Sequence, residues 1–168
     1  VALAPIHKIA RIKRINVATY QSVSGAGRQL VELLDKQVES NLNESDVSGD
    51  QLFAFNVIPQ IDEFQENSFT KEEMKLVWET QKILGDKNLM VNATAVRVPV
   101  KIGHSEAVNI ETEIHITPDQ VKEILSQSQG IKVLDDVSKS IYPTPRRHGN
   151  QTDDVYVGRI RKDHTLKN

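Results

Sequence analysis

The run RINVATYQSVSGAG, residues 14–27, shows the clearest change from one secondary structure to the next. Its first half, residues 15–20, is rich in β-branched and aromatic side chains and therefore predicts a strand. Residues 22–27 are mostly serine and glycine, which predicts a turn. Leucine and valine then recur at near-helical spacing through about Val38, so a helix should follow.

The turn between this strand and helix resembles a dinucleotide-binding fingerprint only in part. Gly25 and Gly27 stand at the spacing of the first two glycines, but Leu30 occupies the place of the third. The fingerprint therefore fails, and a turn that approaches a phosphate remains an open alternative.

Capping boxes mark the starts of two further helices. Thr70 and Glu73 form one box, which predicts a helix over residues 71–84. Thr117 and Gln120 form the other, with proline at the first helical position, and predict a helix over residues 118–127.

The remaining pattern predicts short strands and loops. Two strands at residues 88–100 and 104–114 are separated by Lys101-Ile102-Gly103, which is consistent with a hairpin. Shorter strands are expected at residues 52–58 and 155–161. Strands and helices that alternate irregularly, with an antiparallel pair, indicate the α+β class.

Two polar stretches predict loops. Residues 39–50 are rich in serine, asparagine, aspartate and glycine, so they should form the most mobile surface loop. Residues 138–153, which contain two prolines and a glycine, should also be loop-like.

Composition excludes several classes of function. The chain has 168 residues, 38% of them hydrophobic and 26% charged, which suits one globular domain over residues 1–168. With 21 basic and 23 acidic residues, it has no excess of positive charge that would attract nucleic acid or an anionic membrane. No apolar run reaches the ~20 residues of a bilayer span and no signal peptide is recognisable, so a cytoplasmic location is expected.

Cysteine and histidine usage limits the chemistry further. There is no cysteine, which removes disulfides, thiolate metal sites and a cysteine nucleophile. The five histidines show no metal-binding spacing, so no metal site is expected. The chain opens on the apolar run Val1-Ala2-Leu3-Ala4 without a capping residue, and we expect it to be part of a longer protein.

Four polar residues are candidates for chemistry, and each has a simpler alternative. Glu72 and Lys75 are neighbours on one helix face, which is ordinarily a solvated face. Arg97 interrupts a Val/Pro-rich strand, so it either meets an anion or points to water from a sheet edge. His104 could transfer protons, although an isolated histidine is more often a hydrogen-bonded structural residue.

Several blocks of the sequence closely resemble bacterial aspartate-semialdehyde dehydrogenase. Besides residues 14–27, they are AFNVIPQID (54–62), TKEEMK (70–75) with WET (78–80), VRVPV (96–100) with GHSE (103–106), and VGRIR (157–161). The blocks keep family-like order and spacing over nearly the whole chain, which makes the resemblance specific.

The resemblance implies an NADP-dependent oxidoreductase that interconverts aspartyl phosphate and aspartate semialdehyde, with phosphate as the other product. In the family, a cysteine forms a thioester that hydride transfer resolves, on the route to lysine, threonine and methionine. It also implies a homodimer whose mixed β-sheet carries helices on one face, like the C-terminal domain of glyceraldehyde-3-phosphate dehydrogenase-type enzymes.

The resemblance assigns roles to seven residues. His104 matches the general acid/base and Gln21 the glutamine beside the nucleophile. Arg97 matches the residue that grips the substrate α-carboxylate, Glu72 a substrate-binding acid and Lys75 the phosphate-site lysine.

The two remaining matches, Ser24 and Gly25, lie in the turn that approaches the cofactor. NADP itself would be bound mainly by an N-terminal domain, which this sequence does not include. The family's Asn-Cys motif is also absent, so this chain alone should be inactive. The alternative is a non-catalytic dimerisation module or an inactive paralogue.

Overall fold

The computed structural model describes residues 1–168 except 41–51, 150–151 and 167–168. Its described elements follow the order α1 (Leu3–Ala10), β1 (Ile12–Gln21), a 3-10 turn η1 (Val23–Ala26), α2 (Arg28–Ser40), α3 (Lys71–Leu84), β2 (Met90–Arg97), β3 (Ser105–Thr112), α4 (Pro118–Ser126), β4 (Ile131–Val133), a 3-10 turn η4 (Val137–Lys139), α5 (Pro145–His148) and β5 (Val155–Val157). This is the predicted α+β class, with the helices at residues 71–84 and 118–127 placed to within a residue.

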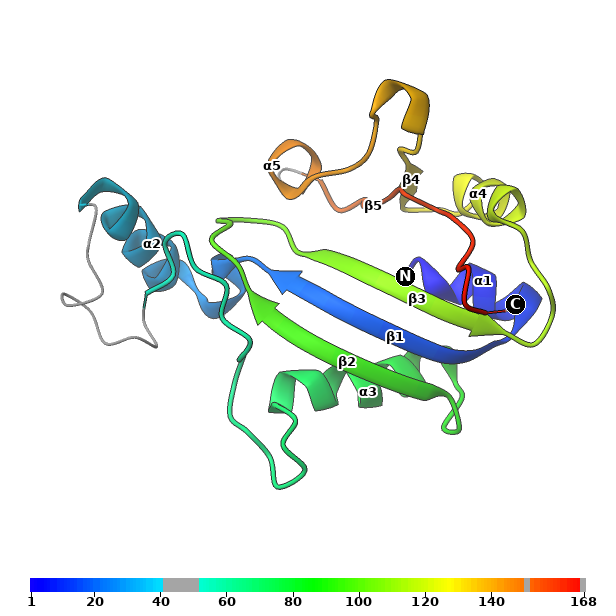
Figure 1. Ribbon diagram of the computed structural model, residues 1–168, viewed down its shortest axis with the longest axis horizontal. Coiled ribbons are helices and arrows are strands. Elements are labelled where there is room, and N and C mark those ends of the chain that lie inside the picture. Colours follow the sequence, from blue (N-terminus) through cyan, green and yellow to red (C-terminus); the bar gives the residue numbers. More distant parts are fainter. Residues whose placement is uncertain (41–51, 150–151, 167–168) are drawn as a thin grey trace.

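The main sheet has three strands in the order β2-β1-β3 (Figure 1). β1 is parallel to β2 and antiparallel to β3, so the sheet is mixed, as expected. The predicted hairpin between residues 88–100 and 104–114 is therefore wrong, because β1 lies between these two strands. Alternating side chains locate strands along the chain, but they do not specify which strand becomes the neighbour.

Helices cover one face of this sheet. Ile15 and Val17 of β1 and Ala93 of β2 point to that face and form one buried cluster with Ile6 of α1 and Leu125 of α4. α3 runs alongside β2, as Figure 1 shows, and adds Leu76 and Leu84 to the cluster. The core thus fixes α3 against β2, and this packing determines where the polar start of α3 lies.

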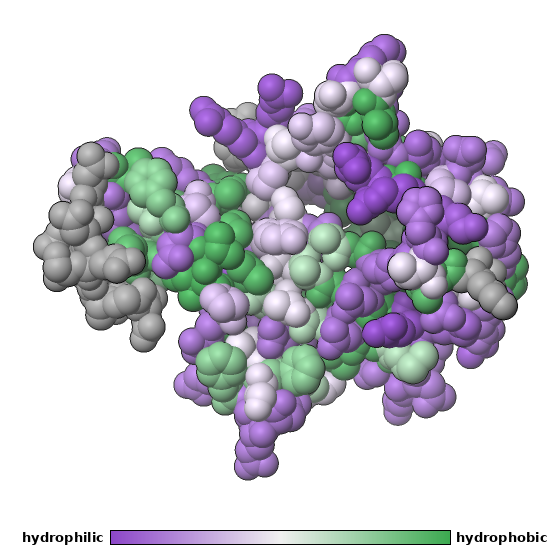
Figure 2. All heavy atoms as spheres, viewed as in Figure 1, coloured by the Kyte–Doolittle hydropathy of each residue, from purple (hydrophilic) through white to green (hydrophobic). Residues whose placement is uncertain are grey.

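Among the described elements, no helix packs on the other face of the sheet, which is turned to the viewer in Figure 1. Asn16, Asn92 and Asn109 form a row across its three strands, and Asn92 Nδ2 donates to Asn16 Oδ1 at 2.7 Å. Tyr20 and Met90 on the same face are 42% and 56% exposed. Figure 2 shows near-neutral hydropathy over the middle of this face, with hydrophobic side chains gathered toward the α2 end. An open face of mixed polarity is available for contact with another molecule.

A second, two-stranded sheet pairs β4 with β5 in parallel. β5 covers residues 155–157 only, so the strand expected over 155–161 is shorter than predicted. The chain turns at Arg159, whose φ is 59°, and Asp135 accepts the amides of Arg159 and Ile160 at 2.9 and 3.2 Å. The Asp135 side chain therefore replaces a continuing strand as the partner of these amides.

The strand expected over residues 52–58 does not form. Gln37 of α2 accepts the amides of Phe53 and Ala54 through Oε1 at 2.9 and 3.1 Å, and Phe55 adopts a left-handed φ of 58°. Only Ile58 pairs with the sheet, as an isolated bridge to Arg97. Backbone groups taken up by a buried side chain cannot join a sheet, which explains the difference.

Two loop predictions have different outcomes. Most of the loop expected at residues 39–50 lies outside the described residues, and residues 39–40 belong to α2. The described part of the tail, residues 138–149 and 152–153, is largely irregular as expected, interrupted by the end of η4 and by the short helix α5. Among the described residues, no helix is long and apolar enough to cross a membrane.

Candidate active site

Polar side chains converge at the end of the main sheet where β1 and β2 finish. Gln21 is the last residue of β1 and lies in register with Arg97, the last residue of β2. β3 begins at the same end, directly after His104, because it runs the other way. The carboxyl ends of parallel strands are a common place for ligand sites, because side chains from several loops meet there.

His104 is held by the turn that follows β1. Its Nδ1 lies 3.2 Å from the backbone nitrogen of Ser22 and 3.0 Å from Ser22 Oγ. A backbone N–H can only donate, so Nδ1 must accept and the proton of the neutral ring resides on Nε2. The Oγ of Ser22 lies 3.1 Å from that of Ser24, which links Ser24 to the same group.

The surroundings of His104 favour its neutral form. The residue is exposed overall, but its partial burial lowers the pKa of the ring, and the positive charge of Arg97 lowers it further, while Glu106 and Glu72 oppose this shift. As arranged, His104 offers Nε2–H as a hydrogen-bond donor. To hold a second proton, Nδ1 must leave the Ser22 amide.

Arg97 points into the protein rather than into water. Only 9% of the residue is exposed, and Nη1 donates to the carbonyl of Ser22 at 2.7 Å. Burial lowers the pKa of Arg97, and the negative charge of Glu72 counteracts this. The alternative of an edge arginine pointing to solvent is therefore wrong, and its guanidinium is a buried cation at the sheet end.

The start of α3 brings an acid and a base to the same place. Thr70 caps this helix, so Glu72 falls in its first turn beside β1. Gln21 Nε2 donates to Glu72 Oε1 at 3.1 Å, and Lys75 Nζ donates to Glu72 Oε2 at 3.1 Å. Glu72 thus joins the end of β1 to Lys75 on the exposed side of the helix.

These contacts also determine the charge of the pair. Burial raises the pKa of Glu72, but the hydrogen bonds from Gln21 and Lys75 and the Lys75 charge outweigh it, so the pKa is lowered. In turn, the hydrogen bond and charge of Glu72 raise the pKa of Lys75. Both groups are therefore ionised at neutral pH. The Glu72 side chain is 24% exposed and that of Lys75 is 46% exposed, so the pair borders solvent and is accessible to a ligand.

Gly25 leaves space beside the histidine. A methyl group at this position would lie 3.3 Å from His104 Nε2 and 3.9 Å from Arg97 Nη1. The first distance is tight for a Cβ atom, and the backbone of Gly25 is exposed. The absence of a side chain thus keeps the protonated edge of His104 open to a ligand.

The structure brings the seven predicted residues into one region, in two groups that meet at adjacent residues Gln21 and Ser22 and in which all but Gly25 are linked by hydrogen bonds. One group contains Gln21, Glu72 and Lys75, and the other contains Ser24, Gly25, Arg97 and His104. Sequence reasoning did not single out Ser22, which is fully buried and contacts both His104 and Arg97. It acts on them partly through its backbone, which any residue possesses, so no sequence signal marked it.

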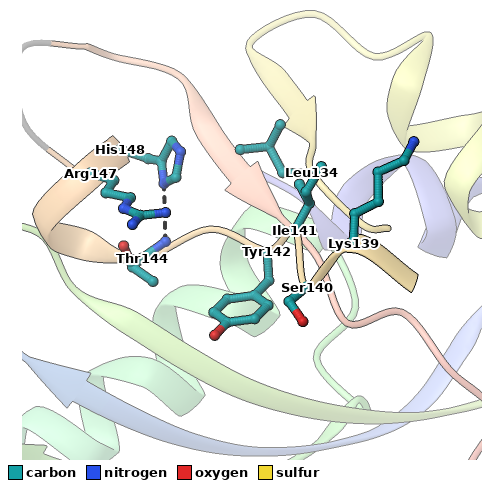
Figure 3. Close-up of a pocket in the computed structure, with 8 residues that line it drawn as sticks. All are labelled: Leu134, Lys139, Ser140, Ile141, Tyr142, Thr144, Arg147 and His148. Carbon is teal, nitrogen blue, oxygen red and sulfur yellow. Dashed lines mark hydrogen bonds between the residues drawn. The ribbon is translucent and has the colours of Figure 1, made fainter. Parts of the chain in front are cut away.

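A cavity of about 460 Å³ lies elsewhere. It is lined by Leu134 and by residues of η4, α5 and the segment between them, with Tyr142, Arg147 and His148 among its walls (Figure 3). His148 Nδ1 accepts the amide of Thr144 at 3.1 Å, which orients that ring locally. None of the seven predicted residues lines this cavity. Within the described residues, no group of three or more His, Asp or Glu could hold a metal ion.

Comparisons with known proteins point to one family. The family model described as "Semialdehyde dehydrogenase, dimerisation domain" matches residues 3–168. Aspartate-semialdehyde dehydrogenase of Shewanella violacea is 53% identical over 167 residues, which cover 97% of this chain and 48% of that protein. The chain therefore spans about half the length of the curated relatives it matches.

Solved structures agree with this assignment. Aspartate semialdehyde dehydrogenase II from Vibrio cholerae, complexed with ASA, superposes with a TM-score of 0.91 at 47% identity, covering 99% of this chain and 49% of that one. The Candida albicans enzyme with NADP superposes with a TM-score of 0.68 at 26% identity, covering 98% of this chain and 46% of that one. The similarity extends over the whole fold, the site region included.

Proposed function

Because this chain belongs to the family of semialdehyde dehydrogenase dimerisation domains, we propose that it is the substrate-binding half of an aspartate-semialdehyde dehydrogenase. The observation that carries the proposal is the convergence of Arg97, Glu72, Lys75 and His104 at one end of the sheet. The reaction is the NADP-dependent interconversion of aspartyl phosphate with aspartate semialdehyde and phosphate, through a thioester on a cysteine outside this chain.

The charges of the site complement the groups of this substrate. Arg97 offers a planar fork of N–H donors for the α-carboxylate, and Glu72 an anion for the ammonium group. Lys75, at the exposed edge of the pair, offers a cation for phosphate. Gln21 orients Glu72 through its hydrogen bond to Oε1. Aspartyl phosphate would thus be held at three points, through its α-carboxylate, ammonium and phosphate groups, which fixes its reacting carbonyl.

His104 would stabilise the negative charge that develops on the reacting oxygen. Its Nε2–H can donate a hydrogen bond to that oxygen, which stabilises negative charge as it develops. Complete proton transfer to or from His104 requires the second protonation described above, and therefore movement of Nδ1 away from Ser22.

Ser24 and Gly25 would contact the cofactor. A Cβ atom at Gly25 would lie close to His104 Nε2. Because glycine has no Cβ, a flat ring of the cofactor could approach the backbone closely beside His104. When bound, NADP supplies the hydride chemistry, and the remainder of a full-length subunit would supply most of its binding surface.

We further propose that the helix-free face of the main sheet forms a homodimer. This face carries the Asn16, Asn92 and Asn109 row and exposes Tyr20 and Met90, although Asn109 also donates to Asp163 of the C-terminal segment. A face that meets its own copy must be self-complementary, and asparagine, which both donates and accepts, satisfies that requirement.

One observation favours a second candidate, a non-catalytic dimerisation module. The 168 residues contain no cysteine, so covalent catalysis through a thiol cannot occur on this chain alone. The reading frame that precedes residue 1 decides between the two, because an Asn-Cys motif there supports the enzyme and a start codon there supports the module.

The proposal is tested by assaying two purified proteins, the complete product of the reading frame and residues 1–168 alone. With aspartate semialdehyde, phosphate and NADP, the complete protein should produce NADPH, and the 168-residue chain should not. A folded complete protein that binds NADP yet produces no NADPH would refute the proposed activity. Preference for an acetylglutamate semialdehyde would refute the proposed substrate.

A further inference from the structure

Glu73, next to the proposed substrate ligand Glu72, is a buried acid with no role in the reaction as described. It is 8% exposed, and both of its carboxylate oxygens accept backbone amides. Oε2 accepts from Thr70 at 2.8 Å, and Oε1 accepts from Ala95 of β2 at 2.9 Å. Each oxygen of this carboxylate therefore has its own backbone partner, one on α3 and one on β2.

The contact with Thr70 alone explains a helix cap, but not the contact with Ala95. The cap of α4 offers a comparison within the same chain, because Gln120 takes the place of Glu73 there. Gln120 Oε1 accepts the amide of Thr117 at 2.9 Å, and Thr117 Oγ1 accepts from Gln120, so one oxygen completes a capping box. The second oxygen of Glu73 therefore has a separate purpose, the link to β2.

This link joins the two elements that carry the substrate ligands. α3 supplies Glu72 and Lys75 from its first two turns, and β2 supplies Arg97 two residues after Ala95. On the same outer edge of β2, the backbone of Arg97 exchanges hydrogen bonds of 2.8 and 3.0 Å with Ile58. Glu73 thus connects α3 to β2 close to both Glu72 and Arg97. The distance between these two proposed substrate ligands therefore depends on this connection.

We infer that Glu73 is a positioning residue for substrate recognition, which acts by fixing the start of α3 against β2. This inference rests on the proposed function, since it assumes that Glu72, Lys75 and Arg97 hold one substrate. It adds a residue that contacts no substrate itself and that holds the ligands of two elements in register.

Glu73→Gln is the informative variant. Glutamine can keep the capping bond to Thr70 through its Oε1, as Gln120 does with Thr117. Its NH₂ group would then face the N–H of Ala95, and no hydrogen bond can form because both groups are donors. The expected result in the complete dehydrogenase is a loss of about 10-fold to 100-fold in kcat/KM for aspartate semialdehyde, as small misplacements of substrate ligands produce. The dissociation constant for NADP should not change.

Gln81→Ala is the matched control. Gln81 Nε2 donates to the carbonyl of Leu89 at 3.0 Å, which joins the same helix to the start of β2 at the end remote from the site. This variant should lower the melting temperature and leave kcat/KM unchanged. Equal losses of kcat/KM in both variants, or unchanged kcat/KM in Glu73→Gln, would overturn the inference.

Amide hydrogen exchange at Ala95 in the unmodified protein tests the link without any activity. The Ala95 amide donates to a side chain rather than to a neighbouring strand, so its slow exchange depends on Glu73. Protection supports the link even if Glu73→Gln does not fold or if the protein acts on another substrate. If the Ala95 amide exchanges as fast as the amides of an unpaired edge strand, the inference is overturned.

Discussion

Replacing Arg97 with lysine in the complete dehydrogenase should weaken substrate recognition while keeping the positive charge. In the structure, Nη1 of Arg97 already donates to the Ser22 carbonyl at 2.7 Å, which anchors the guanidinium. The planar fork has further donors for a carboxylate, whereas lysine has one nitrogen on a flexible stem. A single nitrogen cannot keep the Ser22 bond and also span both oxygens of a carboxylate.

The expected loss follows from the bonds that disappear. At least one charge-assisted hydrogen bond is lost, which costs about 1.5 to 3 kcal/mol. That corresponds to roughly 10-fold to 150-fold in kcat/KM, at tenfold for every ~1.4 kcal/mol. The loss should appear for aspartate semialdehyde only, since the proposed cofactor contacts lie at Ser24 and Gly25.

Steady-state kinetics with each substrate varied, together with fluorescence titration of NADPH, measures this difference. Arg11→Lys is the control, because the Arg11 side chain is 62% exposed and pairs with Glu113 at 3.2 Å, at the opposite end of β1. Retention of kcat/KM in Arg97→Lys would refute the reasoning. A joint fall of kcat/KM, NADPH affinity and melting temperature would instead make Arg97 a structural residue.

Four further predictions concern His104 and the sheet face. His104→Asn should lower kcat by about 10²-fold to 10⁴-fold if the ring transfers protons, and an unchanged rate and pH profile would make it structural. Because burial and Arg97 lower the pKa of His104, the folded protein binds fewer protons than the unfolded chain below pH ~6.5. Stability linked to His104 is thus present above that pH and lost as pH falls through the folded pKa. Glu106→Gln should lower this pKa further in an NMR titration, and a rise would contradict the assignment. Sedimentation of the wild-type protein should show dimers. Ala18→Arg places a charge at the centre of the helix-free face, so this variant should give folded monomers. Dimers that persist in Ala18→Arg would exclude this face as the dimer interface.

Local chemistry explains which parts of the fold could be predicted. Thr70 with Glu73, and Thr117 with Gln120, fix two helix starts through contacts three residues apart, so sequence alone located them. Which strands become neighbours in a sheet depends on the packing of the whole core. The predicted hairpin of β2 and β3 was wrong for that reason. The strand expected at residues 52–58 failed because a distant glutamine side chain bonds its amides.

The same distinction applies to the candidate site. Arg97 could be noticed because a charge in an apolar strand is costly without a partner. The contacts of Ser22 with His104 and Arg97 could not, because they use a backbone amide and carbonyl. Glu73 was recognised as a cap, but its second bond depends on where β2 lies.

The position of β1 in the middle of the sheet makes the candidate site possible. Parallel pairing with β2 places Gln21 level with Arg97, and antiparallel pairing with β3 makes β3 begin at the same end, directly after His104. In a hairpin of β2 and β3, His104 would still lie near Arg97, but Gln21 and the turn at Ser22 would have no fixed place between them. The ligands would then lose the carbonyl that anchors Arg97 and the amide that orients His104. The site therefore forms only when the central strand has joined both neighbours, so its geometry depends on long-range pairing that no single motif encodes.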